Sequence, residues 1–123
     1  MTQTTPAVFG LPEPTEQQPF PGVRRRSFES TQATLASYVM EPGAGFPLHR
    51  HPEEQITVIC DGDAEFTVDG ERHRLTAGQT FVVPPHVEHG LRAGPSGARL
   101  IAVVVPRRAS ADAYTLSNDQ EMT

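Results

Sequence analysis

The chain has 123 residues, enough for one domain around a single hydrophobic core. Its formal net charge of -5 argues against a nucleic-acid partner. We expect no membrane span, because no apolar run has the required length, and no signal peptide, because the start Met1-Thr-Gln-Thr-Thr-Pro does not have that pattern. The single cysteine excludes an intrachain disulfide and favours a reducing, cytoplasmic location. The 12 prolines and 10 glycines that separate short apolar runs are typical of an all-β fold.

Residues 1–22 are rich in proline. Each proline fixes φ and lacks an N–H donor, so we expect an extended N-terminal arm that lies on the domain or on a partner. Three arginines follow, Arg24–Arg26, and in a strand they would point to alternate faces. We expect a barrel over residues 23–106 and a polar C-terminal tail over residues 107–123, which forms a short helical turn or has no fixed structure.

Short runs of apolar residues predict about eight β-strands, at the spacing of a sandwich or barrel. The clearest runs cover residues 33–41, 55–60, 64–68, 72–75, 80–83, 87–92 and 99–105. Asp61-Gly62-Asp63 and Asp69-Gly70 predict tight hairpin turns, and residues 94–97 predict a loop. Alternation assigns these residues to the interior, subject to a one-residue exchange of faces on any strand: Leu35, Val39, Phe66, Val68, Leu100, Ala102 and Val104.

Two histidines, His49 and His51, are one residue apart just before an apolar strand pattern. In extended chain, side chains at i and i+2 point to the same face, so both imidazoles would point to one place. Gln55 has the same parity and can reach that place from further along the strand. Two imidazoles and an amide oxygen on one face form a metal-ligand arrangement.

A second cluster follows the run from Gly78 to Val83, where Pro84-Pro85 turns the chain. His89 begins the return strand and supplies a third imidazole. His86 has the opposite parity, although parity is a poor guide next to two prolines. It is therefore a candidate metal ligand, a candidate acid–base group for catalysis, or an exposed turn residue. His73 lies outside both clusters, and we expect it at the surface or in a cavity lining.

The two clusters resemble the paired motifs of the cupins, a superfamily of double-stranded β-helix (jelly-roll) barrels. Gly43, His49, His51 and Gly62 match the first motif, and Gln55 stands where the family usually has Glu. Gly78, Pro84 and His89 match the second motif, in which His86 replaces a glycine and Ala93 replaces an asparagine. The resemblance covers about residues 30–105. It implies a divalent metal, zinc, nickel, iron or manganese, held by His49, His51, Gln55 and His89.

The neutral Gln55 leaves a divalent ion with its full charge, which favours Lewis-acid chemistry over the Fe(II)-dependent oxygenation that a carboxylate ligand supports. The chain is similar to small bacterial cupins of secondary metabolism described as polyketide cyclases. This implies a metal-dependent cyclase or isomerase that acts on a small oxygenated substrate. The resemblance leaves three alternatives open: a dioxygenase with iron, nickel or manganese, a uronate ring-opening cupin, and a non-catalytic cupin that binds a small ligand.

An inward Gln55 places Ile56, Val58 and Cys60 on the outer face of the same strand. The strand before Pro106 is also apolar on both faces, and a strand of that kind needs a cover. A two-fold dimer is the commonest solution. We therefore expect a homodimer with these three side chains near the interface and Cys60 as a buried, unreactive thiol.

Overall fold

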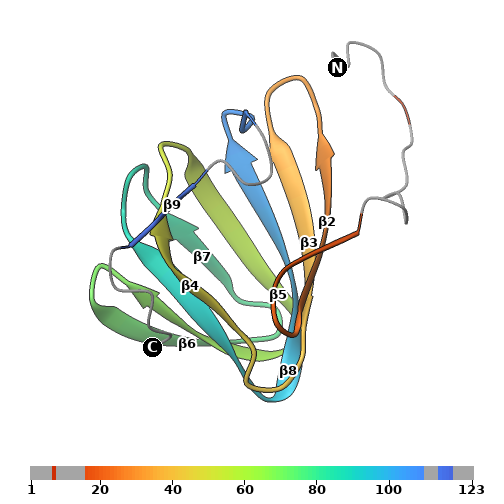
Figure 1. Ribbon diagram of the computed structural model, residues 1–123, viewed down its shortest axis with the longest axis vertical. Coiled ribbons are helices and arrows are strands. Elements are labelled where there is room, and N and C mark those ends of the chain that lie inside the picture. Colours follow the sequence, from red (N-terminus) through yellow and green to blue (C-terminus); the bar gives the residue numbers. More distant parts are fainter. Residues whose placement is uncertain (1–6, 8–15, 110–113, 118–123) are drawn as a thin grey trace.

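The computed structural model describes residue 7, residues 16–109 and residues 114–117, and the regular elements among them are β-strands without a helix. This confirms the predicted all-β class (Figure 1). None of the described residues belongs to a helix that could cross a membrane. The strands are β1 (Gln17–Phe20), β2 (Val23–Glu29), β3 (Thr34–Met40), β4 (Gly45–Arg50), β5 (Glu54–Val68), β6 (Glu71–Thr76), β7 (Thr80–Val83), β8 (His89–Val105) and β9 (Thr115–Leu116).

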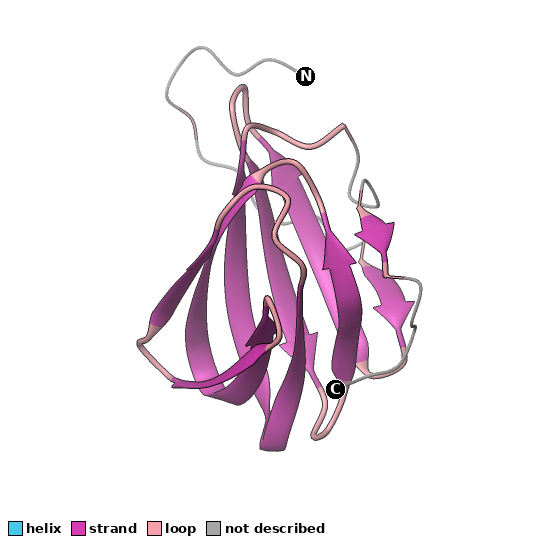
Figure 2. Ribbon diagram, turned by 90° about the vertical axis from the view of Figure 1, so that its left-hand side faces the viewer, coloured by secondary structure: helices cyan, strands magenta, loops and turns pink. Residues whose placement is uncertain are grey.

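Two long strands, β5 and β8, organise the fold. They pair antiparallel from Glu54 opposite Val105 to Val68 opposite His89. One half of β8, residues 98–104, lies between β3 and β5, and the other half, residues 89–92, lies between β4 and β5. Strands β2 and β1 follow β3, β9 pairs with β4, and β6 and β7 pair with the other edge of β5. The sheet curls so that the strands surround a common interior (Figure 2). The antiparallel order and the curl agree with the predicted jelly-roll barrel.

The predicted hairpin turn at Asp61-Gly62-Asp63 is wrong, because β5 continues through it. The register against β8 shifts on both sides of Gly62, which marks a bulge that bends the strand. Gly62 has φ 76°, and a Cβ atom there would lie 2.1 Å from the carbonyl oxygen of Gly97. Glycine is therefore required by the crossing of two backbones. The predicted loop at 94–97 is likewise part of β8.

The interior follows the predicted alternation on β8 and differs by one residue on β3. Leu100, Ala102 and Val104 are buried as predicted, and so is Phe66 of β5, whereas Val68 is half-buried against the core. On β3 the buried residues are Thr34, Ala36, Tyr38 and Met40. The predicted interior residues Leu35 and Val39 are half-buried on the other face. Both faces of β3 carry apolar side chains, so the sequence pattern could not identify the inner one.

Both ends of the chain contribute strands that the sequence did not predict. Within the predicted arm, β1 pairs with β2, and Arg25 of β2 is buried and donates to the Gln17 side-chain oxygen over 2.6 and 3.0 Å. Arg26, on the outer face, pairs with Glu16. Within the predicted tail, β9 pairs with β4 in place of a helical turn. The rest of the arm and tail, residues 1–6, 8–15, 110–113 and 118–123, lies outside the described residues.

The outer face of the sheet carries a row of apolar side chains across five strands. Pairing places these residues side by side: Phe28, Leu35, Val103, Ile56 and Val82. Ile56 is 37% exposed and Val82 is 45% exposed, and Val58 lies half-buried on the same face. Cys60 is exposed in the single chain, so the predicted burial of its thiol requires a partner.

We predict that light scattering on dilute protein gives the mass of two chains. Ile56→Lys places a charge in the apolar row and should shift the mass to one chain, because a buried unpaired charge opposes association. Glu71→Lys, which adds a lysine at an exposed position of β6, should leave the dimer intact. A one-chain mass for the wild-type protein would contradict the predicted homodimer.

Candidate metal centre

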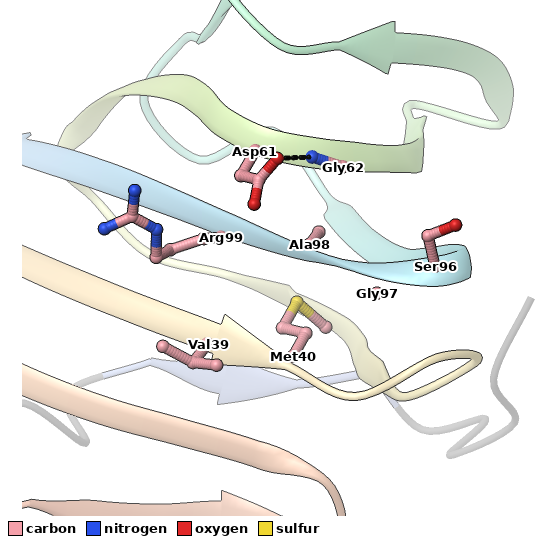
Figure 3. A pocket seen from close by; sticks show the side chains of 8 residues that line it. All are labelled: Val39, Met40, Asp61, Gly62, Ser96, Gly97, Ala98 and Arg99. Carbon is pink, nitrogen blue, oxygen red and sulfur yellow. Dashed lines mark hydrogen bonds between the residues drawn. The ribbon is translucent and has the colours of Figure 1, made fainter.

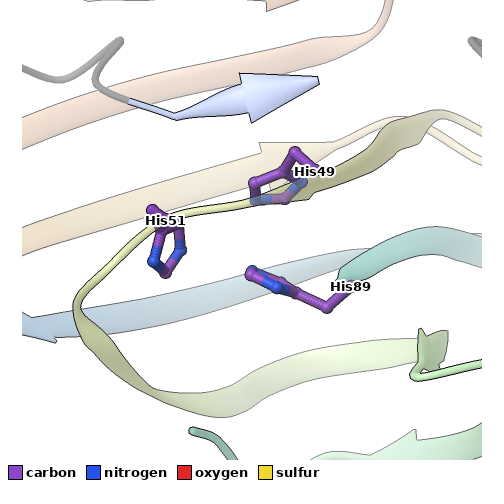
Figure 4. Close-up of side chains that lie close together, drawn as sticks. All are labelled: His49, His51 and His89. Atoms are coloured by element: carbon purple, nitrogen blue, oxygen red, sulfur yellow. The ribbon is translucent and has the colours of Figure 1, made fainter. Parts of the chain in front are cut away.

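Three of the predicted ligands meet inside the barrel. His49 lies on β4, His51 follows this strand, and His89 is the first residue of β8, directly opposite His49. All three side chains are buried, and one nitrogen of each lies within 4.8 Å of the others. The ring centroids of His49 and His89 are 4.2 Å apart, and those of His51 and His89 are 4.9 Å apart. Figure 4 shows the three rings around one space.

Backbone carbonyls fix the orientation of each ring. Nδ1 of His49 lies 2.8 Å from the Pro47 oxygen, Nδ1 of His51 lies 3.1 Å from the Glu53 oxygen, and Nδ1 of His89 lies 2.9 Å from the Val87 oxygen. A carbonyl only accepts hydrogen bonds, so Nδ1 of His49 and of His89 must carry the proton. Their Nε2 atoms then have a free lone pair, which is the form of imidazole that binds a metal. In His51 both ring nitrogens face acceptor oxygens, and a bound ion would take the place of a proton on Nε2.

Gln55 on β5 is held with its oxygen toward the cluster. Its Nε2 donates to the Thr57 hydroxyl over 2.9 Å, which leaves Oε1 on the side of His51. Oε1 lies 3.1 Å from Nε2 of His51, close enough for one ion to contact both atoms. Glu54 is exposed on the opposite face of β5. The structure therefore brings all four predicted ligands to one place.

The histidines are neutral for physical reasons that act together. Burial lowers the pKa of His49 well below its ordinary value, and the nearby His89 adds to the effect. Burial also lowers the pKa of His51, with the positive charge of Arg108 as the next cause, and lowers the pKa of His89 to about 4. Nε2 of His89 is buried without a hydrogen-bond partner. A bound cation would satisfy this atom, so the donor set fits a divalent metal ion.

His86, the predicted catalytic residue, is not brought into the cluster. Its side chain is exposed, and its backbone N–H donates to the His51 carbonyl over 2.8 Å. His86 has φ 68°, a conformation that favours glycine, and it stands where the cupin motif has a glycine. The catalytic role of its imidazole stays a prediction. His73 is exposed on β6, near Glu71.

Sequence reasoning missed three residues beside the cluster. Glu53 is buried, and one of its carboxylate oxygens lies 3.4 Å from Nδ1 of His51. Its parity is that of His51 and Gln55, so the alternation could have identified it. Tyr114 packs its ring 5.3 Å from that of His49, and Arg108 is buried nearby. Both lie in the predicted tail, where no periodic pattern indicated that the chain returns to the barrel.

A small cavity adjoins the cluster inside the barrel. Its volume is about 20 Å³, and its lining consists of Tyr38, Phe46, His49, Gln55, Leu91, Leu100 and Arg108. A larger hollow, of about 300 Å³, lies between Met40, Asp61 and Arg99 (Figure 3). Its lining contains none of the four candidate ligands. The small interior cavity, and not the larger hollow, is therefore the candidate active site.

The lowered histidine pKa values predict acid lability of the metal-free protein. Below pH 6.5 the unfolded chain binds protons at these side chains, whereas the folded chain does not until its own lower pKa is reached. The free energy of unfolding should therefore decrease as the pH is lowered from about 7 to about 4. His89 alone should account for about 3 kcal/mol of this decrease by about pH 4. Urea unfolding with EDTA measures this loss. His89→Asn should reduce it and His73→Asn should not; a stability unchanged between about pH 7 and about pH 4 contradicts the assignment.

The positive φ of His86 predicts that His86→Gly keeps the fold and the metal site. The change removes backbone strain but gives the unfolded chain more freedom, so the free energy of unfolding should rise by at most about 1 kcal/mol or stay unchanged. His86→Val should lower it, because a β-branched residue rarely adopts this conformation. Urea unfolding and metal content check both variants. Full metal content with lost turnover in His86→Gly would instead assign the imidazole to catalysis.

The chain is similar in sequence to several known proteins. H2HPP isomerase of Bacillus subtilis is 31% identical over 100 residues, which are 80% of this chain and 42% of that protein. Dimethylsulfoniopropionate lyase DddW of Ruegeria pomeroyi is 36% identical over 73 residues, 58% of this chain and 48% of the lyase. Quercetin 2,3-dioxygenase of Bacillus subtilis is 34% identical over 61 residues, 49% of this chain and 18% of the dioxygenase. The chain thus spans less than half the length of these relatives.

Among solved structures, that of KdgF from Halomonas sp. superposes with a TM-score of 0.76 at 30% identity, over 85% of this chain and 97% of that chain. The family model described as Cupin domain matches residues 36–105. This range is more than half of the chain, and it includes the three clustered histidines and Gln55. The chain belongs to the cupin family.

Proposed function

We propose that the protein is a metal-dependent cupin enzyme that uses a divalent ion as a Lewis acid on a small oxygenated substrate, in a cyclisation or isomerisation. The ion would be held by His49, His51, Gln55 and His89. The neutral donor set is the observation that carries this proposal. Three imidazoles whose pKa values are lowered and one amide oxygen bring no negative charge to the ion.

A bound ion would polarise a carbonyl or enolate oxygen of the substrate. The three histidines hold their Nδ1 protons in hydrogen bonds to carbonyls, so they are not available as bases while Nε2 binds the ion. Another group must therefore move the proton. Among the residues that line the cavity, Tyr38 is the one that carries a hydroxyl group, and it is our candidate for this role. The names of two relatives, an isomerase and a lyase, agree with non-redox chemistry.

A dioxygenase is the second candidate, favoured by the match to quercetin 2,3-dioxygenase. It would use the same histidines with iron, nickel or manganese. The similarity to the KdgF structure keeps a uronate ring-opening cupin as a further alternative, and a non-catalytic cupin that binds a small ligand would share the site. Gln55 favours the first proposal over oxygenation, because the facial carboxylate typical of non-haem iron oxygenases is replaced by an amide.

We predict that the zinc- or nickel-loaded protein exchanges hydrogens next to a carbonyl for solvent deuterium, measured by NMR in D₂O with small 2-oxo acids and β-diketones. Gln55→Glu should slow this exchange roughly tenfold, which corresponds to about 1.4 kcal/mol, because the carboxylate neutralises charge at the ion. The same variant should bind Fe(II) and Mn(II) more tightly. Gln79→Glu, the same change in an exposed turn, should alter neither property.

Each other outcome favours a different reading of the site. Oxygen consumption by the iron-loaded protein would favour a dioxygenase. Bound metal without turnover of any tested compound would favour a ligand-binding cupin. A wild-type chain that binds no divalent ion would overturn the metal centre itself.

A further inference from the structure

We propose that Arg108 forms an anion-binding subsite in the interior cavity, so that the ligand of this protein is a small carboxylate whose charged group lies between Arg108 and the histidine cluster. This inference rests on the proposed function and names the substrate class of the same site. It assigns a specificity-determining role to a residue outside both histidine motifs.

The backbone places Arg108 firmly inside the barrel. Its N–H donates over 2.9 Å to the hydroxyl oxygen of Thr34, a residue of β3 that is itself 1% exposed. Thr34 pairs with Val104, near the end of β8, so the chain turns back onto β3 directly after that strand. The Arg108 residue is only 4% exposed. A long charged side chain is seldom this buried without a specific task.

The charge of Arg108 acts on the whole cluster. Its positive charge is one of the causes that lower the pKa values of His49, His51 and His89. Arg108 also lines the cavity together with His49 and Gln55, and it is the one formally charged side chain of that lining. A divalent ion at the histidines would add positive charge beside Arg108, and this positive charge exceeds the single negative charge of Glu53 and favours an anion in the cavity.

The other arginines nearby have different tasks. Arg25 is equally buried, but its guanidinium donates two hydrogen bonds to Gln17, at the pair of strands β1 and β2. Arg107 is half-buried and donates to the Ser30 carbonyl over 3.5 Å. Neither belongs to the lining of the cavity. Arg107 is therefore a matched control, since it has the same chemistry one position away.

A carboxylate fits this subsite better than a neutral group. The planar guanidinium offers parallel N–H donors that match the two oxygens of a carboxylate. The cavity is small, about 20 Å³, so formate, the smallest carboxylate, is the appropriate probe. Formamide has nearly the same shape without the charge, and it separates charge recognition from fit.

The experiment titrates formate and formamide into the zinc-loaded 123-residue chain and follows binding by NMR. Arg108→Met should weaken formate binding roughly tenfold, the loss expected for one charge-assisted hydrogen bond, and should leave formamide binding unchanged. Zinc affinity should stay equal or increase, because a positive charge near the ion is removed. Arg107→Met should change none of these values. A purely structural role of Arg108 would instead weaken zinc and formate binding together.

Unchanged formate affinity in Arg108→Met would overturn the inference while leaving the metal centre intact. If Arg108→Met does not fold, Arg108→Gln, which also removes the charge but keeps a polar side chain, replaces it. Reduced formate affinity with full zinc affinity then supports the subsite, and unchanged formate affinity overturns it. If the wild-type chain binds no zinc, the proposed metal centre fails, and the same formate titration on the metal-free chain still decides whether Arg108 binds anions.

Discussion

Three contacts between imidazole Nδ1 atoms and backbone carbonyls determine what the histidine cluster can do. They hold the proton of His49 and of His89 on Nδ1 and leave Nε2 with a free lone pair, and they orient His51 so that its Nε2 faces the side-chain oxygen of Gln55. Burial acts in the same direction, because it penalises protonation of the rings. The acceptors belong to residues two positions away along the chain, which makes the orientation a property of the local backbone. The cluster is thus arranged for a cation by the fold itself.

The curl of the sheet explains how distant residues meet at this cluster. Along the ladder of β5 and β8, Gln55 pairs with Val104 at one end, and His89 pairs with Val68 at the other end. In a flat sheet these two ends would be far apart. The bulges around Gly62 bend β5, and β4 closes against the start of β8, so that His49 lies opposite His89. Gly62 thus affects the geometry of the cluster indirectly, because it permits the bend of β5.

The four candidate ligands could be found from sequence because each sits on extended backbone within a gapped motif, where parity and spacing carry information. The bulge at Gly62 could not be predicted from the sequence, because a glycine between two aspartates indicates a hairpin equally well. The inner face of β3 was missed because both faces of the strand are apolar. Arg108 and Tyr114 were missed for a different reason. Their positions depend on where the chain turns after Pro106, which is decided by tertiary contacts such as the hydrogen bond to Thr34.

The glutamine and the arginine support each other in this proposal. A glutamate at position 55 would bring a negative charge into the cavity, beside both the ion and Arg108, and would compete with an anionic ligand for both. Gln55 keeps the same oxygen near His51 but removes that charge, and Thr57 holds the amide so that its N–H group points away from the cluster. Glu53, beside His51, is then the buried carboxylate next to the cluster, and an anionic ligand would add further negative charge at the cavity. A neutral ligand would gain the polarising effect of the ion but not the attraction of Arg108, so the same pair of residues would serve both reactivity and choice of substrate.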